Sequence, residues 1–103
     1  MPRMDTLHAS KLFESLSSPV RLAVFQQLAA AGSKGMVAGD LAKHLNLAPN
    51  NLSFHLKTLH HAGLVCAKQE GRFVRYFAQL DLMMALTGFL TQNCCAETGE
   101  CCR

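Results

Sequence analysis

Apolar residues recur at helical spacing near the start of the chain. The first set stands at positions i, i+3, i+4 and i+7 and comprises Ala9, Leu12, Phe13 and Leu16. This spacing predicts an amphipathic helix over residues 5–16. Ser18 and Pro19 favour a new helix start, because serine caps free N–H groups and proline suits the first turn. A second helix is therefore expected over residues 19–31, ending at Gly32.

The middle of the chain predicts two more helices separated by a tight turn. Apolar residues mark a short helix over residues 37–45, and asparagine and proline mark a turn over 46–49. Leucines at helical spacing then predict a helix over residues 49–61, and Gly63 is placed to end it. Two helices joined in this way are typical of a helix-turn-helix unit.

The pattern then changes from helical to strand spacing. Residues 64–68 and 73–78 are rich in strand formers, and residues 69–72 between them have the composition of a hairpin loop. A last helix is expected over residues 81–92, with Asp81 as its cap. The remaining segment shows no periodicity.

These elements predict a mainly α fold with a β-hairpin wing, in the order α-α-α-α-β-β-α, which is a winged helix-turn-helix. We expect a DNA-binding and dimerisation domain over residues 1–93 and a cysteine-rich sensor tail over residues 94–103. The first and last helices lie outside the helix-turn-helix unit. Their apolar faces are natural surfaces for a homodimer.

Composition adds little to this picture. The chain has 103 residues, 50% of them hydrophobic, and a formal net charge of +3, which is a mild indication of an anionic partner. No apolar segment follows a basic start, and no apolar run approaches the length of about 18 residues that spans a bilayer. We therefore expect a cytoplasmic protein with no membrane partner.

The helix over residues 49–61 has the side-chain pattern of a DNA-reading helix. Three leucines face the core and leave polar groups that can bind base edges and phosphates of double-stranded DNA. The predicted contacts on this helix are Asn50, Asn51, Ser53, His55, Lys57 and Thr58. Those on the wing are Lys68, Arg72 and Arg75, which suit phosphate contact. Periodicity alone fits a solvated helix face equally well.

Cysteines gather at the C-terminus. Of the five in the chain, four fall within nine consecutive residues, namely Cys94, Cys95, Cys101 and Cys102. Cytosolic thiols are kept reduced, so such a cluster indicates metal binding or redox chemistry rather than a disulfide framework. Cys66 stands in a predicted strand, where a small buried hydrophobe is expected.

The chain resembles the ArsR/SmtB family of bacterial metalloregulators over nearly its whole length except the tail. The resemblance is carried by residues 16–22 (LSSPVRL), 40–45 (DLAKHL), 48–59 (APNNLSFHLKTL), 62–65 (AGLV) and 70–76 (EGRFVRY). It implies a dimeric winged-helix repressor that binds its operator when free and leaves DNA when its inducer binds.

Two of the family's inducer sites have no counterpart here. The founding arsenic sensors carry Cys-Val-Cys-Asp-Leu on the third helix, where this chain has Val37-Ala38-Gly39-Asp40-Leu41. The family's zinc sensors use Asp and His on the last helix, but no histidine follows Asp81. The tail instead resembles a subgroup of arsenic repressors with sensor cysteines just past the last helix.

This resemblance implies an arsenic(III) inducer, with antimony(III) chemically close and not discriminated, and no organic cofactor. Soft thiolates suit such ions, and arsenic(III) favours three sulfurs in a pyramid. Cys94, Cys95 and Cys101 are the preferred trio, with Cys102 as a spare. The predicted function is an arsenic(III)-responsive repressor that, on release from its operator, derepresses arsenic-resistance genes.

Other interpretations of the cysteines stay open. Four thiolates can hold structural zinc, a zinc-responsive repressor would have the same fold, and exposed vicinal thiols can form a redox switch. A thiol-dependent arsenate reductase is disfavoured, because Cys94 and Cys95 follow a helix C-terminus, whose dipole raises a thiol pKa. We therefore expect a regulator and not an enzyme.

Overall fold

The computed structural model describes residues 4–92. Helix α1 (Thr6–Leu16) begins at Asp5, whose Oδ1 accepts the His8 N–H at 2.8 Å. Helix α2 (Pro19–Ala31) begins at Ser18, whose Oγ accepts the Arg21 N–H at 3.3 Å. The start of α2 confirms the expected cap at Ser18, whereas Asp5, expected inside the first helix, is the cap of α1; in both, a side-chain oxygen satisfies a free N–H of the first turn.

The helix-turn-helix unit consists of α3 (Ala38–Leu45) and α4 (Pro49–His61), as predicted. Asn46 ends α3 in the left-handed conformation, with φ at 55°, and thereby turns the chain toward α4. Asparagine tolerates this conformation better than most residues, which explains its place in the turn. The three leucines of α4 are buried, and α4 packs against α1, α2, α3 and β2.

The wing is a three-stranded antiparallel sheet, and only two of its strands were predicted. β2 (Val65–Glu70) and β3 (Phe73–Ala78) form the hairpin, closed by a two-residue turn between Glu70 and Phe73. The hairpin loop is therefore shorter than the predicted one. The additional strand, β1 (Met36–Val37), pairs with the other side of β3 and follows the 3₁₀ turn η1 (Gly32–Lys34).

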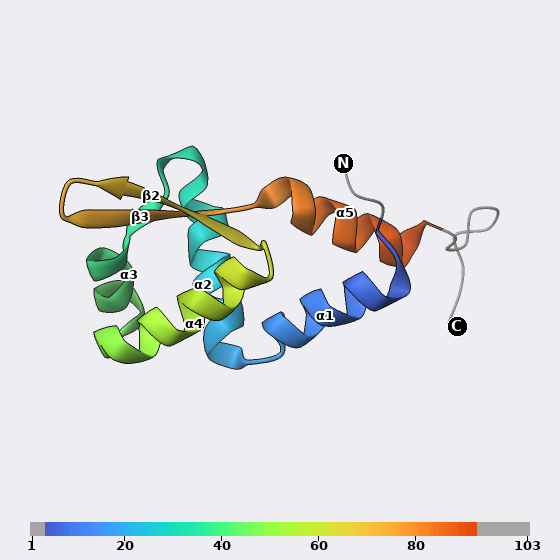
Figure 1. The fold of residues 1–103 in the computed structure, drawn as a ribbon, viewed down its shortest axis with the longest axis horizontal. Helices are drawn as coiled ribbons and strands as arrows, with labels where there is room; N and C mark the ends of the chain where they lie inside the picture. Colours follow the sequence, from blue (N-terminus) through green and yellow to red (C-terminus); the bar gives the residue numbers. More distant parts are fainter. Residues whose placement is uncertain (1–3, 93–103) are drawn as a thin grey trace.

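Helix α5 (Leu80–Thr91) closes the fold beside α1 (Figure 1). The prediction that Asp81 caps this helix was wrong, because the helix starts one residue earlier and Gln79 is its N-cap. α1 and α5 lie at one end of the molecule, and α3 and the wing lie at the other (Figure 1). Among the described residues, no helix is long and apolar enough to cross a membrane.

One apolar core joins the helices to the sheet. It is built mostly from leucines, and its fully buried members include Leu12, Val24, Leu28, Leu41, Leu52, Leu56, Leu59, Leu64, Val65 and Leu86. Each helix contributes at least one of these side chains. The core therefore fixes how α4 is rotated and which of its side chains reach the surface.

Candidate nucleic-acid interface

The polar side of α4 forms the first part of the site. Burial of its leucines, each at most 2% exposed, turns the opposite side of the helix outward. The predicted contact residues that are exposed there are Asn50, Asn51, Ser53 and Lys57. Within the described part of the chain, none of these four side chains makes a hydrogen bond to another protein group. Their donors and acceptors face solvent and are free to meet another molecule.

His55 and Thr58 are placed differently from the other predicted contacts. His55 is half-buried, and its Nδ1 lies 3.4 Å from Nη1 of Arg21 on α2. Arg21 also donates from Nε to the Ser15 carbonyl oxygen, at 2.6 Å, at the end of α1. Thr58 donates to the Phe54 carbonyl oxygen, at 3.3 Å, within α4. These two side chains are therefore engaged inside the protein, and His55 links α4 to α1 through Arg21.

The wing contributes two exposed cations. Arg72 lies in the two-residue turn and Lys68 on β2, both exposed. Arg75 is half-buried instead, and its Nε lies 3.0 and 3.1 Å from the two carboxylate oxygens of Glu70. It also donates to the Lys34 carbonyl oxygen at 3.1 Å. The geometry therefore gives Arg75 a role in holding the hairpin, whereas Arg72 and Lys68 have no ion-pair partner among residues 4–92.

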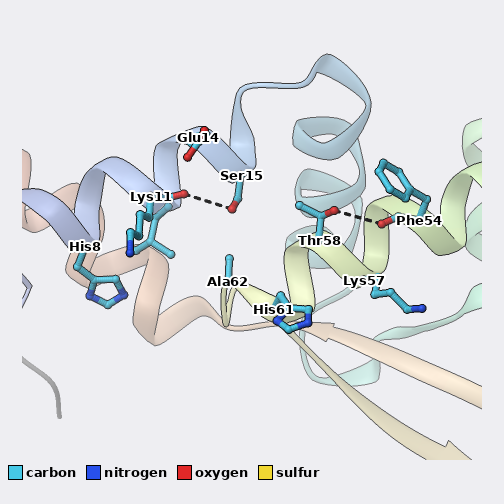
Figure 2. A pocket seen from close by; sticks show the side chains of 10 residues that line it. His8, Lys11, Glu14, Ser15, Phe54, Lys57, Thr58, His61 and Ala62 are labelled. Atoms are coloured by element: carbon cyan, nitrogen blue, oxygen red, sulfur yellow. Dashed lines mark hydrogen bonds between the residues drawn. The ribbon is translucent and has the colours of Figure 1, made fainter.

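An open groove of about 640 Å³ lies between α1 and the outer side of α4 (Figure 2). Lys11 and His8 line it from α1, and Lys57 and His61 line it from α4. Glu14 is the acidic residue of the lining. The groove thus combines a largely apolar lining with two lysines and one glutamate next to the exposed face of α4.

Sequence reasoning missed three residues of this region. Lys11 lies on the helix that was assigned to dimerisation, and Arg21 was not considered as a partner of α4. Phe54 is 65% exposed on the polar side of α4. The sequence could have indicated its exposure, because Phe54 does not share the helical spacing of the three buried leucines.

The predicted inducer ligands Cys94, Cys95, Cys101 and Cys102 lie outside the described residues. Cys66 is a free thiol on β2 and is half-buried, so it is less buried than expected. Over residues 4–92, no group of three or more His, Cys, Asp and Glu side chains is arranged to hold a metal ion. Val37 and Gly39 adjoin the start of α3 and carry no ligating side chain.

The arrangement of α3, α4 and the basic wing defines a winged helix-turn-helix DNA-binding protein. A family model described as a helix-turn-helix domain matches residues 16–65. The chain is 35% identical to the HTH-type transcriptional regulator CmtR of Mycobacterium tuberculosis over 94 residues. This alignment covers 90% of this chain and 77% of CmtR.

Two solved structures share the fold. An ArsR-like transcriptional regulator from Rhodococcus sp. RHA1 superposes with a TM-score of 0.73 and 26% identity, covering 84% of this chain and 78% of that chain. A protein described as a possible transcriptional regulator for arsenical resistance gives a TM-score of 0.69 and 26% identity, covering 80% and 82%. This chain belongs to the ArsR family of DNA-binding transcriptional regulators. The prediction of a regulator rather than an enzyme is confirmed.

Proposed function

We propose that this protein is a homodimeric repressor that leaves its operator when arsenic(III) binds the C-terminal cysteines. The carrying observation is the cluster of four cysteines within nine residues, shortly after the end of α5. Cys94, Cys95 and Cys101 are the proposed ligands, and Cys102 is a spare thiol. Release from the operator would derepress arsenic-resistance genes.

The chemistry of the tail supports this inducer. Thiolates are soft ligands and select thiophilic ions. Arsenous acid exchanges its hydroxyl groups for thiols: each As–S bond that forms replaces one As–O bond, and the thiol proton leaves with the hydroxide as water. No oxidant or reductant is required. Antimony(III) undergoes the same exchange, and the structural relative described as a possible regulator of arsenical resistance is consistent with this class of inducer.

The homodimer is supported by apolar side chains on the two outer helices. Leu7 on α1 is 67% exposed, and Met84 and Leu90 on α5 are 70% and 60% exposed. α1 and α5 contact each other, so these side chains occur on neighbouring elements at one end of the molecule (Figure 1). Clustered exposed apolar residues are typical of a protein interface. We assign this end to the second subunit.

A dimer formed at this end provides a route from the tail to DNA. Two recognition helices must lie about 34 Å apart to enter successive major grooves on one face of the duplex. The tail follows α5 in the sequence, so an ion bound by its cysteines would be held close in the chain to a helix of the proposed dimer surface. The ion acts only by binding the DNA-free state more tightly, and typical couplings of about 1–3 kcal/mol weaken DNA binding roughly 5–150-fold.

The test is an operator-binding titration of the reduced full-length protein with arsenite, antimonite, zinc and peroxide. We expect arsenite and antimonite to release the DNA. Cys94→Ser and Cys95→Ser should bind the operator as the wild type does but should not respond to arsenite. Cys66→Ser is the matched control, because it removes one thiol from β2 and should keep the response.

Three results would contradict the proposal in different ways. Release by zinc but not by arsenite would identify a zinc-responsive repressor. Release by peroxide alone would identify a redox switch. Loss of operator binding in Cys94→Ser without any added ion would indicate that the tail cysteines hold a structural metal.

A further inference from the structure

Phe54 occupies an unexpected place on the recognition helix. It is two residues from both Leu52 and Leu56, and so it points away from the core on a helix with 3.6 residues per turn. Its side chain is 65% exposed. A single exposed phenylalanine elsewhere would need no explanation. This one lies among the asparagines and Lys57, on the surface that an HTH regulator presents to bases.

The phenyl ring is supported by a chain of contacts inside the protein. It meets the His55 ring edge to face, with centroids 5.5 Å apart and planes at 68°. His55 lies 3.4 Å from the Arg21 guanidinium, which donates to the Ser15 carbonyl oxygen. Three helices therefore contribute to the position of the ring. Such support lowers the entropy that the side chain loses on binding.

The surroundings of the ring include cationic side chains that complement nucleic acid. Figure 2 shows Phe54 at the end of the groove that is farthest from His8. The groove is lined by Lys11 and Lys57, whose charges complement phosphates, and Glu14 is its acidic residue. A phenyl ring forms no conventional hydrogen bond with a base edge. The feature of the major groove that it can contact favourably is the C5 methyl group, which thymine alone among the four bases carries.

We infer that Phe54 is a specificity-determining residue that reads a thymine by packing on its C5 methyl group in the major groove. This rests on α4 being the DNA-reading helix and is independent of the inducer. The flanking polar residues, Asn50 and Lys57, bind neighbouring base edges and phosphates. Phe54 adds discrimination against cytosine and against uracil, which lack the methyl group.

The test uses operator DNA that the full-length protein itself selects from randomised duplexes. Each thymine of the selected half-site is replaced singly by deoxyuridine, which removes the methyl group and keeps the base pair. For the wild type we expect one position at which this change weakens binding about fourfold, the effect of one buried methyl group. Phe54→Ser should bind thymine and deoxyuridine duplexes equally at that position. Because Phe54 is exposed, the variant should fold normally, which circular dichroism checks.

Phe73→Ser is the matched control. Phe73 is also an exposed phenylalanine, at 57%, but it lies on the wing strand β3. This variant should keep the thymine preference of the wild type. The inference is overturned if no position senses the methyl group, or if Phe54→Ser keeps the wild-type preference. Operator binding without arsenite release would instead count against the proposed inducer alone.

Discussion

Helices α4 and α5 place their apolar side chains in opposite ways. On α4 the leucines 52, 56 and 59 are at most 2% exposed, and the remaining side is mostly polar. On α5 only Leu86 is buried, while Met84 and Leu90 are at least 60% exposed. The leucines of α4 are buried by the rest of the chain, whereas α5 leaves two large apolar side chains exposed.

This difference separates two tasks within a small fold. The recognition helix must hold a fixed rotation, because a rotated α4 would present different side chains to the bases. The core supplies that rotation without any partner. In the proposed homodimer the outer helices would give their exposed apolar surface to a second subunit, and the spacing of the two recognition helices would then be set at an interface that ligand binding can alter.

The largest expected effect is on the α4 side of the comparison. Leu59 is fully buried, so Leu59→Ala removes packing and leaves a cavity. We expect the free energy of unfolding to fall by about 3 kcal/mol, within the usual range for such changes. Urea denaturation measures this. Gln26→Ala, at an exposed site on α2, is the control and should change stability by less than about 0.5 kcal/mol. Equal effects of the two variants would show that α4 is not held by the core.

The second expected effect is on the α5 side. Met84→Asp places a charge at the proposed dimer surface, where it would be desolvated on association. We expect the dimer dissociation constant to rise about 30-fold or more, as for an interface residue worth about 2 kcal/mol. Sedimentation over a range of concentrations measures it.

Gln26→Asp is the matched control for that charge, because it adds an aspartate at an exposed site on α2. It should leave the dimer intact. An unchanged dissociation constant for Met84→Asp would place the interface on another surface.

Local signals in the sequence were sufficient for most of the fold. Ser18 and Pro19 fix the start of α2, and Pro49 fixes that of α4, because capping and proline act within one turn. The strand Met36–Val37 was missed because two residues carry no periodicity. Its strand geometry comes from pairing with β3, about 40 residues later in the chain, which no local pattern encodes.

The candidate site was predicted less completely than the fold. Exposure of Asn50 and Lys57 follows from helical periodicity and was predictable. The engagement of Arg75 with Glu70 and of His55 with Arg21 was not, because each depends on two elements meeting in space. A sequence lists the cations of a wing, but only the fold shows which of them already have a partner.

The third prediction concerns Arg21, which links the recognition helix α4 to the outer helix α1. Arg21→Met keeps the apolar stem of the side chain but removes the contacts to Ser15 and His55. We expect the operator affinity to fall about fivefold, equivalent to about 1 kcal/mol for lost hydrogen bonds. Fluorescence anisotropy with labelled operator measures it.

A double-mutant cycle with His55→Leu tests whether Arg21 acts through His55. If it does, Arg21→Met should cost little more operator affinity in the His55→Leu background. Fully additive losses would show that Arg21 affects DNA binding by another route. Unchanged circular dichroism in all variants excludes unfolding as the cause.

The smallest expected effect distinguishes the two arginines of the wing. Arg72 is exposed in the turn, so Arg72→Ala should lower the slope of log affinity against log salt by about 1 per subunit, as for one lost phosphate contact. Arg75 is already paired with Glu70 across the hairpin, so Arg75→Ala should leave that slope unchanged. It should instead reduce the free energy of unfolding by less than about 1 kcal/mol, because the ion pair is partly solvated. A reduced slope for Arg75→Ala would mean that this arginine exchanges Glu70 for phosphate when the wing meets DNA.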